Sequence, residues 1–309
     1  MEHLEQLRSI IEAGQRELGF SHHGLTESGE VRHVLKKTAA TAGTLSLRAL
    51  QLPPAQKQFR ALEVVQHPAG QLVPMSATIL RKSRVAQAGA SILVVEESPE
   101  AVPVGGTGDI AMVNRPRRWS LVEAAQILPV ADGDDVPEVA PPVSRQDVEF
   151  TGPSYATRFS LTRRDISEHG MDVLLVELME AIGLGLARAA DHCLLTAIAA
   201  ATPPAFSLAS ASASGVEFTE LKALCGTAAA GAAVGDDGTL RVSGVLAELT
   251  PVNAATVVGA FTRSAVAVHD SLRVSVERRN AAGDLVVTIW SDLVALLPSG
   301  DAKFWTVSA

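Results

Sequence analysis

Cysteine and long apolar runs are both scarce in this 309-residue chain. The two cysteines, Cys193 and Cys225, sit in apolar or alanine-rich surroundings without CxxC spacing, which argues against a disulfide framework or a zinc site. A reducing cytoplasm fits this cysteine usage. The longest uncharged stretch, 193–216, contains Pro203 and Pro204 and cannot form the roughly 20-residue apolar helix that a bilayer requires. Residues 1–20 are charged and do not look like a secretion signal.

Positive charge is also in deficit. Lys and Arg number 26 against 34 Asp and Glu, and the net charge is −8. This balance argues against a protein that wraps nucleic acid, because phosphate binding depends on clustered basic residues. Only six of the basic residues are lysines, which leaves few donors for covalent Lys–Asn cross-links, and none are predicted. The remaining 20 are arginines, which are favoured at protein interfaces because the guanidinium pairs with carboxylates through two bonds.

The chain contains enough apolar residues for one large or two medium cores, at 47% hydrophobic and 19% charged. Its first part has the pattern of an arm. Residues 2–20 predict a short amphipathic helix, and a second helical stretch follows Ser28 and ends at Gly43. A small β element follows, for which three runs are expected: Ala61–Gln66, Val73–Leu80 and Ser91–Glu96. The Pro- and Gly-rich stretch Pro99–Gly108 is the best boundary in this half.

The middle of the chain combines a loop, a strand and a long helix. Residues 130–154 contain four prolines and few residues that could be buried, which describes a long protruding loop. Tyr155–Thr162 alternates strictly and predicts a half-buried strand. After a turn, Asp172 is the expected N-cap of a helix that runs to Ala201. The glycines at 183 and 185 inside this helix predict that something packs closely there.

The last third is expected to be mostly β. Residues 202–216 look like a linker, and a helix is expected over Phe218–Ala229. Four segments beyond them predict strands, and a fifth closes the chain: Gly244–Leu249, Thr256–Phe261, Leu272–Arg278 with Leu285–Trp290 as a hairpin, and finally Lys303–Val307.

The motifs that could carry chemistry are weak. His22-His23 lacks further ligands at metal-binding spacing, so a surface pair is favoured. Asp191-His192-Cys193 has the residue types of a thiol hydrolase, yet consecutive helical side chains point about 100° apart and cannot form a triad among themselves. Gly105-Gly106-Thr107-Gly108 has no Lys-Ser/Thr after it and fails as a phosphate loop. No catalytic residue, cofactor or metal is predicted, and the chain is expected not to be an enzyme.

Three basic clusters could contact partners. Arg115, Arg117 and Arg118 flank Trp119, a combination that could grip nucleic acid or an acidic partner, but the negative net charge favours contact with another protein subunit. The other candidate contact residues are Arg163, Arg164, Arg278 and Arg279, together with the acidic Asp134, Asp135 and Glu138.

The order of these elements resembles that of the major capsid proteins of tailed bacteriophages with the Hong Kong 97 type fold. The resemblance covers roughly residues 107–309. It rests on Asp135–Val139, on Tyr155–Ile166 leading into the long helix, on Ala189–His192, on Ala255–Arg263 and on the closing run Leu272–Thr306. These segments match the family in their order along the chain and in their general pattern of residue types, and none of them is a strict motif.

The resemblance implies an α+β fold with an N-terminal arm, an extended loop, a long spine helix, and peripheral and axial domains. On this basis residues 1–106 are expected to form the arm with a small β element, and 107–171 the extended loop with its flanking strands. Residues 172–216 would be the spine helix and linker, 217–270 the axial domain, and 271–309 the closing strands of the peripheral domain.

The resemblance also implies a function: self-assembly, as hexamers and pentamers, into the icosahedral head that encloses the double-stranded DNA of a tailed phage. The expected partners are further copies of the chain, a separate scaffolding protein, a portal and a possible decoration protein, with packaged DNA contacted only non-specifically. The expected location is the virion capsid, assembled in the host bacterial cytoplasm. Two alternatives stay open, an encapsulin-type nanocompartment shell and a mixed α/β hydrolase that uses Cys193 or Cys225.

Overall fold

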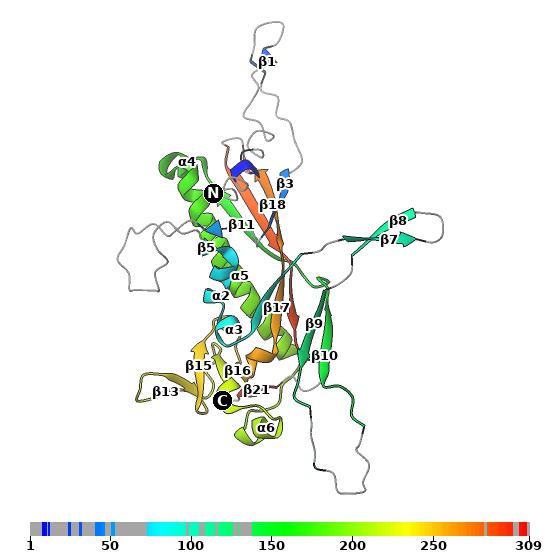
Figure 1. Ribbon diagram of the computed structural model, residues 1–309. Helices are drawn as coiled ribbons and strands as arrows, with labels where there is room; N and C mark the ends of the chain where they lie inside the picture. The colour runs from blue at the N-terminus through cyan, green and yellow to red at the C-terminus, as the bar shows by residue number, and fades with distance from the viewer. Residues whose placement is uncertain are drawn as a thin grey trace.

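The computed structural model describes residues 8–10, 12, 24–25, 31–32, 41–46, 51–52, 73–96, 99–104, 109–114, 117–125, 129, 138–280, 283–298 and 303–307. Within them, an elongated body of helices and sheets carries hairpins that project from it (Figure 1). The class is α+β, as the sequence predicts. No helix in the described part of the chain is long and apolar enough to cross a membrane.

The longest described helix, α5 (Met171–Ala200), runs along the body (Figure 1). It begins two residues earlier than the predicted N-cap at Asp172 implies, and the expected turn before it is itself a helix, α4 (Arg163–His169). Thr162 and Asp165 form a capping box at the start of α4, in which the Asp165 amide donates to Thr162 Oγ1 at 3.1 Å. Asp172 lies in the first turn of α5, and Gly170 takes the N-cap position.

The close packing expected around the mid-helix glycines is absent at Gly185. This residue is exposed, and a Cβ there would meet no described atom within 4 Å.

A four-stranded antiparallel sheet packs against the upper half of α5, in the order β11-β19-β18-β3. Its strands are β11 (Tyr155–Leu161), β19 (Leu285–Ser291), β18 (Ser271–Arg278) and β3 (Thr41–Ser46). The predicted strand and hairpin are confirmed. The helix expected after Ser28 is wrong where it can be compared, because β2 (Val31–Arg32) pairs with β1 (Gly24–Leu25) and β3 continues through Gly43.

The strand expected over Val73–Leu80 is also wrong from its third residue onward. After β5 (Val73–Pro74), which pairs with β4 (Gln51–Leu52), the chain forms α2 (Met75–Lys82) and α3 (Arg84–Gln87). Met75 and Ile79, four residues apart, are both fully buried in the core that α5 shares. The expected run Ala61–Gln66 lies outside the described residues.

A three-stranded sheet forms the centre of the body. β6 (Ser91–Val95), predicted from the sequence, runs parallel to β17 (Ala265–His269), and β17 pairs antiparallel with β20 (Leu293–Leu296). Val266 and Val268 belong to the main core with α5, whereas Ala265 and Ala267 face a separate apolar cluster. The sheet is therefore covered on both faces.

Residues 203–260 and 303–307 form a lower lobe at the C-terminal end of α5 (Figure 1). Its sheet has the order β13-β14-β15-β12-β16-β21. The strands are β12 (Lys222–Cys225), β13 (Ala232–Val234), β14 (Leu240–Val242), β15 (Val245–Leu249), β16 (Thr256–Gly259) and β21 (Phe304–Val307). A second core fills it, centred on Trp305 and Cys225.

Three expectations fail in this lobe. The helix expected over Phe218–Ala229 is a short 3-10 helix, η2 (Phe218–Glu220), followed by β12. The expected linker contains a helix, α6 (Leu208–Ala213), which Ser207 and Ser210 cap reciprocally. The final strand, β21, pairs with β16 and not with β18 or β19, so it closes the lower lobe instead of the upper sheet. Phe304 on β21 lies directly over Gly259, where any side chain would collide with its ring.

Asp191, in the buried stripe of α5, joins the helix to α3. Its Oδ1 accepts from the Ser83 hydroxyl at 2.7 Å and the Val85 amide at 3.0 Å, and its Oδ2 accepts from the Arg84 amide at 3.1 Å. The carboxylate is only 2% exposed. It therefore satisfies amide donors at the N-terminus of α3 that would otherwise be buried without partners. Burial raises the pKa of Asp191, and these three hydrogen bonds oppose the rise.

We predict that Asp191→Ala lowers the free energy of unfolding by about 3 kcal/mol, because three buried donors lose their acceptor. Urea unfolding followed by circular dichroism measures this change. Glu180→Ala, at an exposed position of the same helix, is the matched control and should change stability by less than about 0.5 kcal/mol. Equal losses in the two variants would contradict the role given to Asp191.

Candidate interaction surfaces

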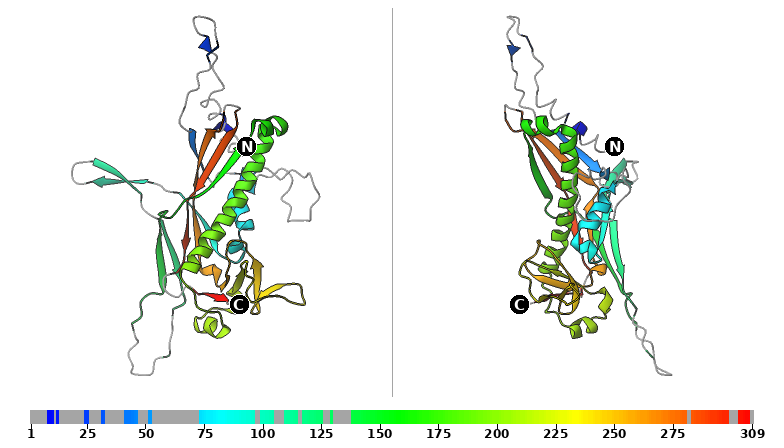
Figure 2. Two further views of the ribbon diagram at one scale, coloured as in Figure 1. Left: turned by 180° about the vertical axis from the view of Figure 1, so that it is seen from behind. Right: turned by 90° about the vertical axis from the view of Figure 1, so that its left-hand side faces the viewer.

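A long hairpin projects from the lower part of the body (Figure 2). It consists of β9 (Arg117–Val122) and β10 (Val143–Val148), paired in register from Arg117↔Val148 to Val122↔Val143. The protruding loop expected over 130–154 is thus partly a strand. Towards the tip no described residue is buried, and Val122 at the end of β9 is 72% exposed while Val139, which precedes β10, is 66% exposed.

Three predicted contact residues stand side by side on β9. Arg117 is exposed, and Arg118 forms an ion pair with Asp147 across the hairpin at 2.8 Å, which raises the pKa of Arg118 and lowers that of Asp147. Trp119 is half-buried and packs within the chain. Arg115, Asp134 and Asp135 lie outside the described residues. Glu138 is exposed and lies five residues before the first residue of β10.

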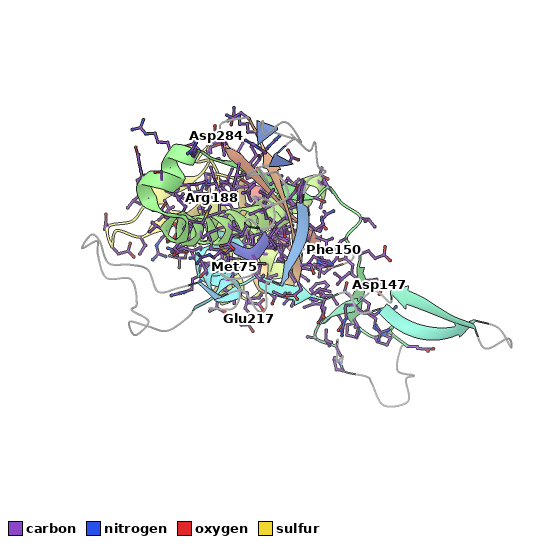
Figure 3. The ribbon with its side chains drawn as sticks, turned by 90° about the horizontal axis from the view of Figure 1, so that it is seen from above. Met75, Asp147, Phe150, Arg188, Glu217 and Asp284 are labelled. Atoms are coloured by element: carbon purple, nitrogen blue, oxygen red, sulfur yellow. The ribbon has the colours of Figure 1, made fainter. Side chains whose placement is uncertain are left out.

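The base of this hairpin rests on the central sheet. Val148 is buried with Ala265, Ala267 and Leu296, and the half-buried Trp119 and Phe150 pack against this cluster. Seen from above, Asp147 lies farther from the helices of the body than Phe150 does (Figure 3). We call this cluster the hairpin base. It fixes where the hairpin leaves the body without supporting its tip.

Arg263 holds β9 from the side. It follows β16, in the 3-10 helix η3 (Phe261–Arg263), and its Nη2 lies 3.2 Å from Glu220 Oε2 while its Nη1 lies 3.7 Å from Glu123 Oε1. Its side chain is 20% exposed, so both contacts are partly shielded from water. Arg263 therefore connects the end of β9 to the start of the lower lobe.

A second polar contact holds the chain after β10. Arg273 Nη2 donates to Ser154 Oγ at 2.9 Å and to Asp292 Oδ1 at 3.1 Å, and the Ser154 hydroxyl donates to the same carboxylate at 2.5 Å. The segment between β10 and β11 is thus attached to β18 and to the residue between β19 and β20. Neither Arg263 nor Asp292 was predicted as a contact residue, because each is an isolated charge whose partners come from distant segments.

The arginines at the upper end of the body bond within the chain. The Arg163 amide donates to Asp284 Oδ1 at 3.0 Å, which is the first cause of the lowered pKa of Asp284. Arg164 pairs with Glu168 one turn along α4 at 2.7 Å. Arg279 Nη1 donates to Ser160 Oγ at 3.2 Å and Arg278 Nε to the Asn280 carbonyl at 2.8 Å. These predicted contact residues gather at one end of the molecule, far along the chain from β9.

The lower lobe exposes large apolar side chains. Phe218 is 59% and Val234 69% exposed. The other members of this set are Leu208, Leu246 and Leu249. They lie at the opposite end of the body from the arginines (Figure 1).

Thiol chemistry has little support in the geometry. Cys193 is buried, and burial raises the pKa of its thiol, so the nucleophilic thiolate is disfavoured. The carboxylate of the neighbouring Asp191 already accepts hydrogen bonds from the start of α3. Nδ1 of the exposed His192 lies 3.3 Å from the hydroxyl oxygen of Tyr155. Cys225 is fully buried in the lobe core. Among the described residues no group of three or more His, Cys, Asp or Glu side chains is gathered for a metal, and His22-His23 lies outside them.

Comparisons with known proteins give matches only in structure. No protein-family model matches the chain, and no curated protein matches it in sequence. The chain is similar to the capsid of a native GTA particle, at 13% identity and a TM-score of 0.41, over 82% of this chain and 97% of that chain. It is also similar to the mature capsid of bacteriophage PhiM1, at 9% identity and a TM-score of 0.41, over 82% and 92%.

A further similar structure is a virus-like particle from Pyrococcus furiosus, at 12% identity and a TM-score of 0.37, over 76% of this chain and 98% of that chain. At these identities and TM-scores the similarity concerns the path of the chain alone.

We predict that Arg263→Ala lowers the free energy of unfolding by about 1–2 kcal/mol, since two partly buried carboxylates lose their counter-charge. Hydrogen exchange should become faster in residues 117–125, which the arginine holds. Arg164→Ala, which removes an exposed pair, is the control and should leave both measurements nearly unchanged. If hydrogen exchange in residues 117–125 is unchanged in Arg263→Ala, the arginine does not hold this segment to the body.

Tyr155 is the single tyrosine of the chain, and burial together with Cys193 raises its pKa to about 12. Absorbance at 295 nm should therefore titrate near pH 12 in the folded protein and near pH 10 in denaturant. Because the unfolded tyrosine loses its proton first, stability should fall as the pH rises from about 10 to 12. A native midpoint near 10 would show that the ring is solvated instead.

Proposed function

We propose that this chain is the major capsid protein of a tailed bacteriophage, and that many copies assemble as hexamers and pentamers into an icosahedral head around double-stranded DNA. The observation that carries the proposal is the hairpin β9–β10, which is anchored at its base by the buried Val148, whereas every other described residue of Arg117–Val122 and Val143–Asp147 is exposed or only half-buried. An isolated two-stranded hairpin is marginally stable in water. Contacts with neighbouring copies supply the missing stabilisation.

The distribution of exposed groups supports the same function. Arginines and their carboxylate partners gather at the upper end, apolar side chains at the lower lobe, and the hairpins project between these ends. Contacts between unlike surfaces of identical chains build rings and shells, whereas a simple dimer needs one self-complementary patch. Interfaces of obligate assemblies usually bury more than about 2,000 Å².

In this function the chain is a structural, non-catalytic subunit of the virion capsid, assembled in the host bacterial cytoplasm. Its partners are copies of itself, a separate scaffolding protein, a portal and, in some particles, a decoration protein, and packaged DNA is contacted non-specifically. The net charge of −8 fits a shell that does not hold DNA tightly. An encapsulin-type shell is the alternative, and it is distinguished by its content, which is protein cargo rather than a packaged genome.

We predict that replacing residues 124–141 by a four-residue turn abolishes particle formation and leaves a folded subunit. The Glu123 amide donates to the Pro142 carbonyl at 2.8 Å, so a short turn can join these positions without disturbing the base. Sedimentation and electron microscopy measure assembly, and thermal unfolding measures the fold of the subunit.

A variant that keeps the length of this segment but replaces it with Gly and Ser is the control for its sequence. Closed shells formed by the shortened chain would overturn the assignment of the hairpin as an assembly element. A wild-type chain that stays a single molecule at every concentration and with every scaffolding partner would overturn the proposed function itself.

A further inference from the structure

A second hairpin projects from the body, away from β9–β10 (Figure 2). It consists of β7 (Pro99–Val104) and β8 (Asp109–Asn114), paired antiparallel in register from Pro99↔Asn114 to Val104↔Asp109. No further described strand joins either of them. Each strand therefore has one edge that is not used within the described chain.

The prolines of β7 fix which backbone groups point outward. In an antiparallel pair, opposed residues alternate between those that exchange hydrogen bonds and those whose N–H and C=O point away from the partner strand. Proline has no N–H to exchange. Pro99 and Pro103, which are four residues apart, therefore occupy outward-pointing positions, and so does Ala101 between them. Their partners on β8 are Asn114, Ile110 and Met112.

The two edges of the hairpin consequently differ. On the outer edge of β7, two of the three outward positions lack an N–H donor. On the outer edge of β8, Ile110, Met112 and Asn114 all retain theirs. Proline on an edge strand is a common way to prevent pairing with another chain. One edge is blocked and the other is left able to pair.

We infer that the outer edge of β8 pairs with an edge strand of a second copy of this chain, so that the hairpin becomes part of a sheet that crosses a subunit boundary. This inference rests on the proposed function, which places identical chains side by side. The chain itself offers edges to pair with, since β11 ends the upper sheet and β13 ends the lobe sheet. A contact between two different edges of identical chains is heterologous, as a closed shell requires.

The test compares Met112→Pro with Ala101→Pro in the full chain. These residues face each other across the hairpin, and both direct their N–H outward, so neither proline removes a hydrogen bond within the hairpin. Met112→Pro blocks the open edge, whereas Ala101→Pro adds a third proline to the blocked one. We expect the subunit concentration needed for assembly to rise by about tenfold or more in Met112→Pro and to stay within about twofold of wild type in Ala101→Pro.

Each outcome decides the matter. If the two variants assemble equally well, or lose assembly equally, pairing through β8 is overturned. A proline on the open edge of β8 would then affect assembly no more than a proline on the blocked edge of β7. Thermal unfolding of the unassembled subunits checks that the two prolines perturb folding alike. A wild-type chain that forms no particles refutes the proposed function, whereas assembling wild type with indistinguishable variants refutes this inference alone.

Hydrogen exchange of the wild-type protein provides a second measurement that needs no variant. Amides of Ile110 and Met112 should exchange rapidly in free subunits and at least tenfold more slowly in assembled shells, while the Ala101 amide should change little. The same experiment identifies the partner strand as the edge that becomes protected together with β8. Exchange at β8 that is the same before and after assembly would overturn the inference.

Discussion

The buried carboxylate of Asp191 joins two parts of the chain that are more than a hundred residues apart in sequence. By accepting hydrogen bonds from Ser83, Arg84 and Val85 it fixes the start of α3 on the long helix α5. Two residues after α3, Gly89 turns the backbone with a φ of +115°, close against Thr262, and β6 begins at Ser91. An ionisable side chain in the middle of α5 thus helps to place β6 beside β17, together with the hydrogen-bonded ladder between the two strands.

The central sheet in turn positions the projecting hairpin. β17 is buried on both faces because α5 covers one and the hairpin base covers the other. Arg263, which follows β16 and precedes β17, attaches the lower lobe to β9 through Glu220 and Glu123. The body therefore fixes the direction of the hairpin at its base, and on the proposed function it offers the remaining length to a neighbour.

The sequence predicted the elements whose burial is periodic. Tyr155–Leu161 alternates and packs one face on the core, and α5 carries its apolar stripe over its whole length. β17 gave no such signal, since a strand covered on both faces does not alternate. Val73–Leu80 resembled a strand because Val73, Thr78 and Ile79 are residue types that favour β structure, but burial of Met75 and Ile79 against α5 outweighs that preference. The contact residues were predicted by type alone, so Trp119, which packs within its own chain, was selected with Arg117, which is exposed.

The ion pairs of the surface bear on what can hold identical copies together. Arg118–Asp147, Arg158–Glu277 and Arg164–Glu168 are all exposed pairs within one chain, and such pairs typically contribute less than about 1 kcal/mol each. An arginine that already has a carboxylate partner gains little by exchanging it for another on a neighbour. Backbone N–H groups on an unpaired strand edge contribute more free energy of association. Each forms a hydrogen bond with an acceptor on the neighbour, and the apolar surface beside it is removed from water at the same time. On the proposed function, strand edges and the apolar side chains of the lower lobe are therefore expected to contribute more to assembly than the abundant arginines do.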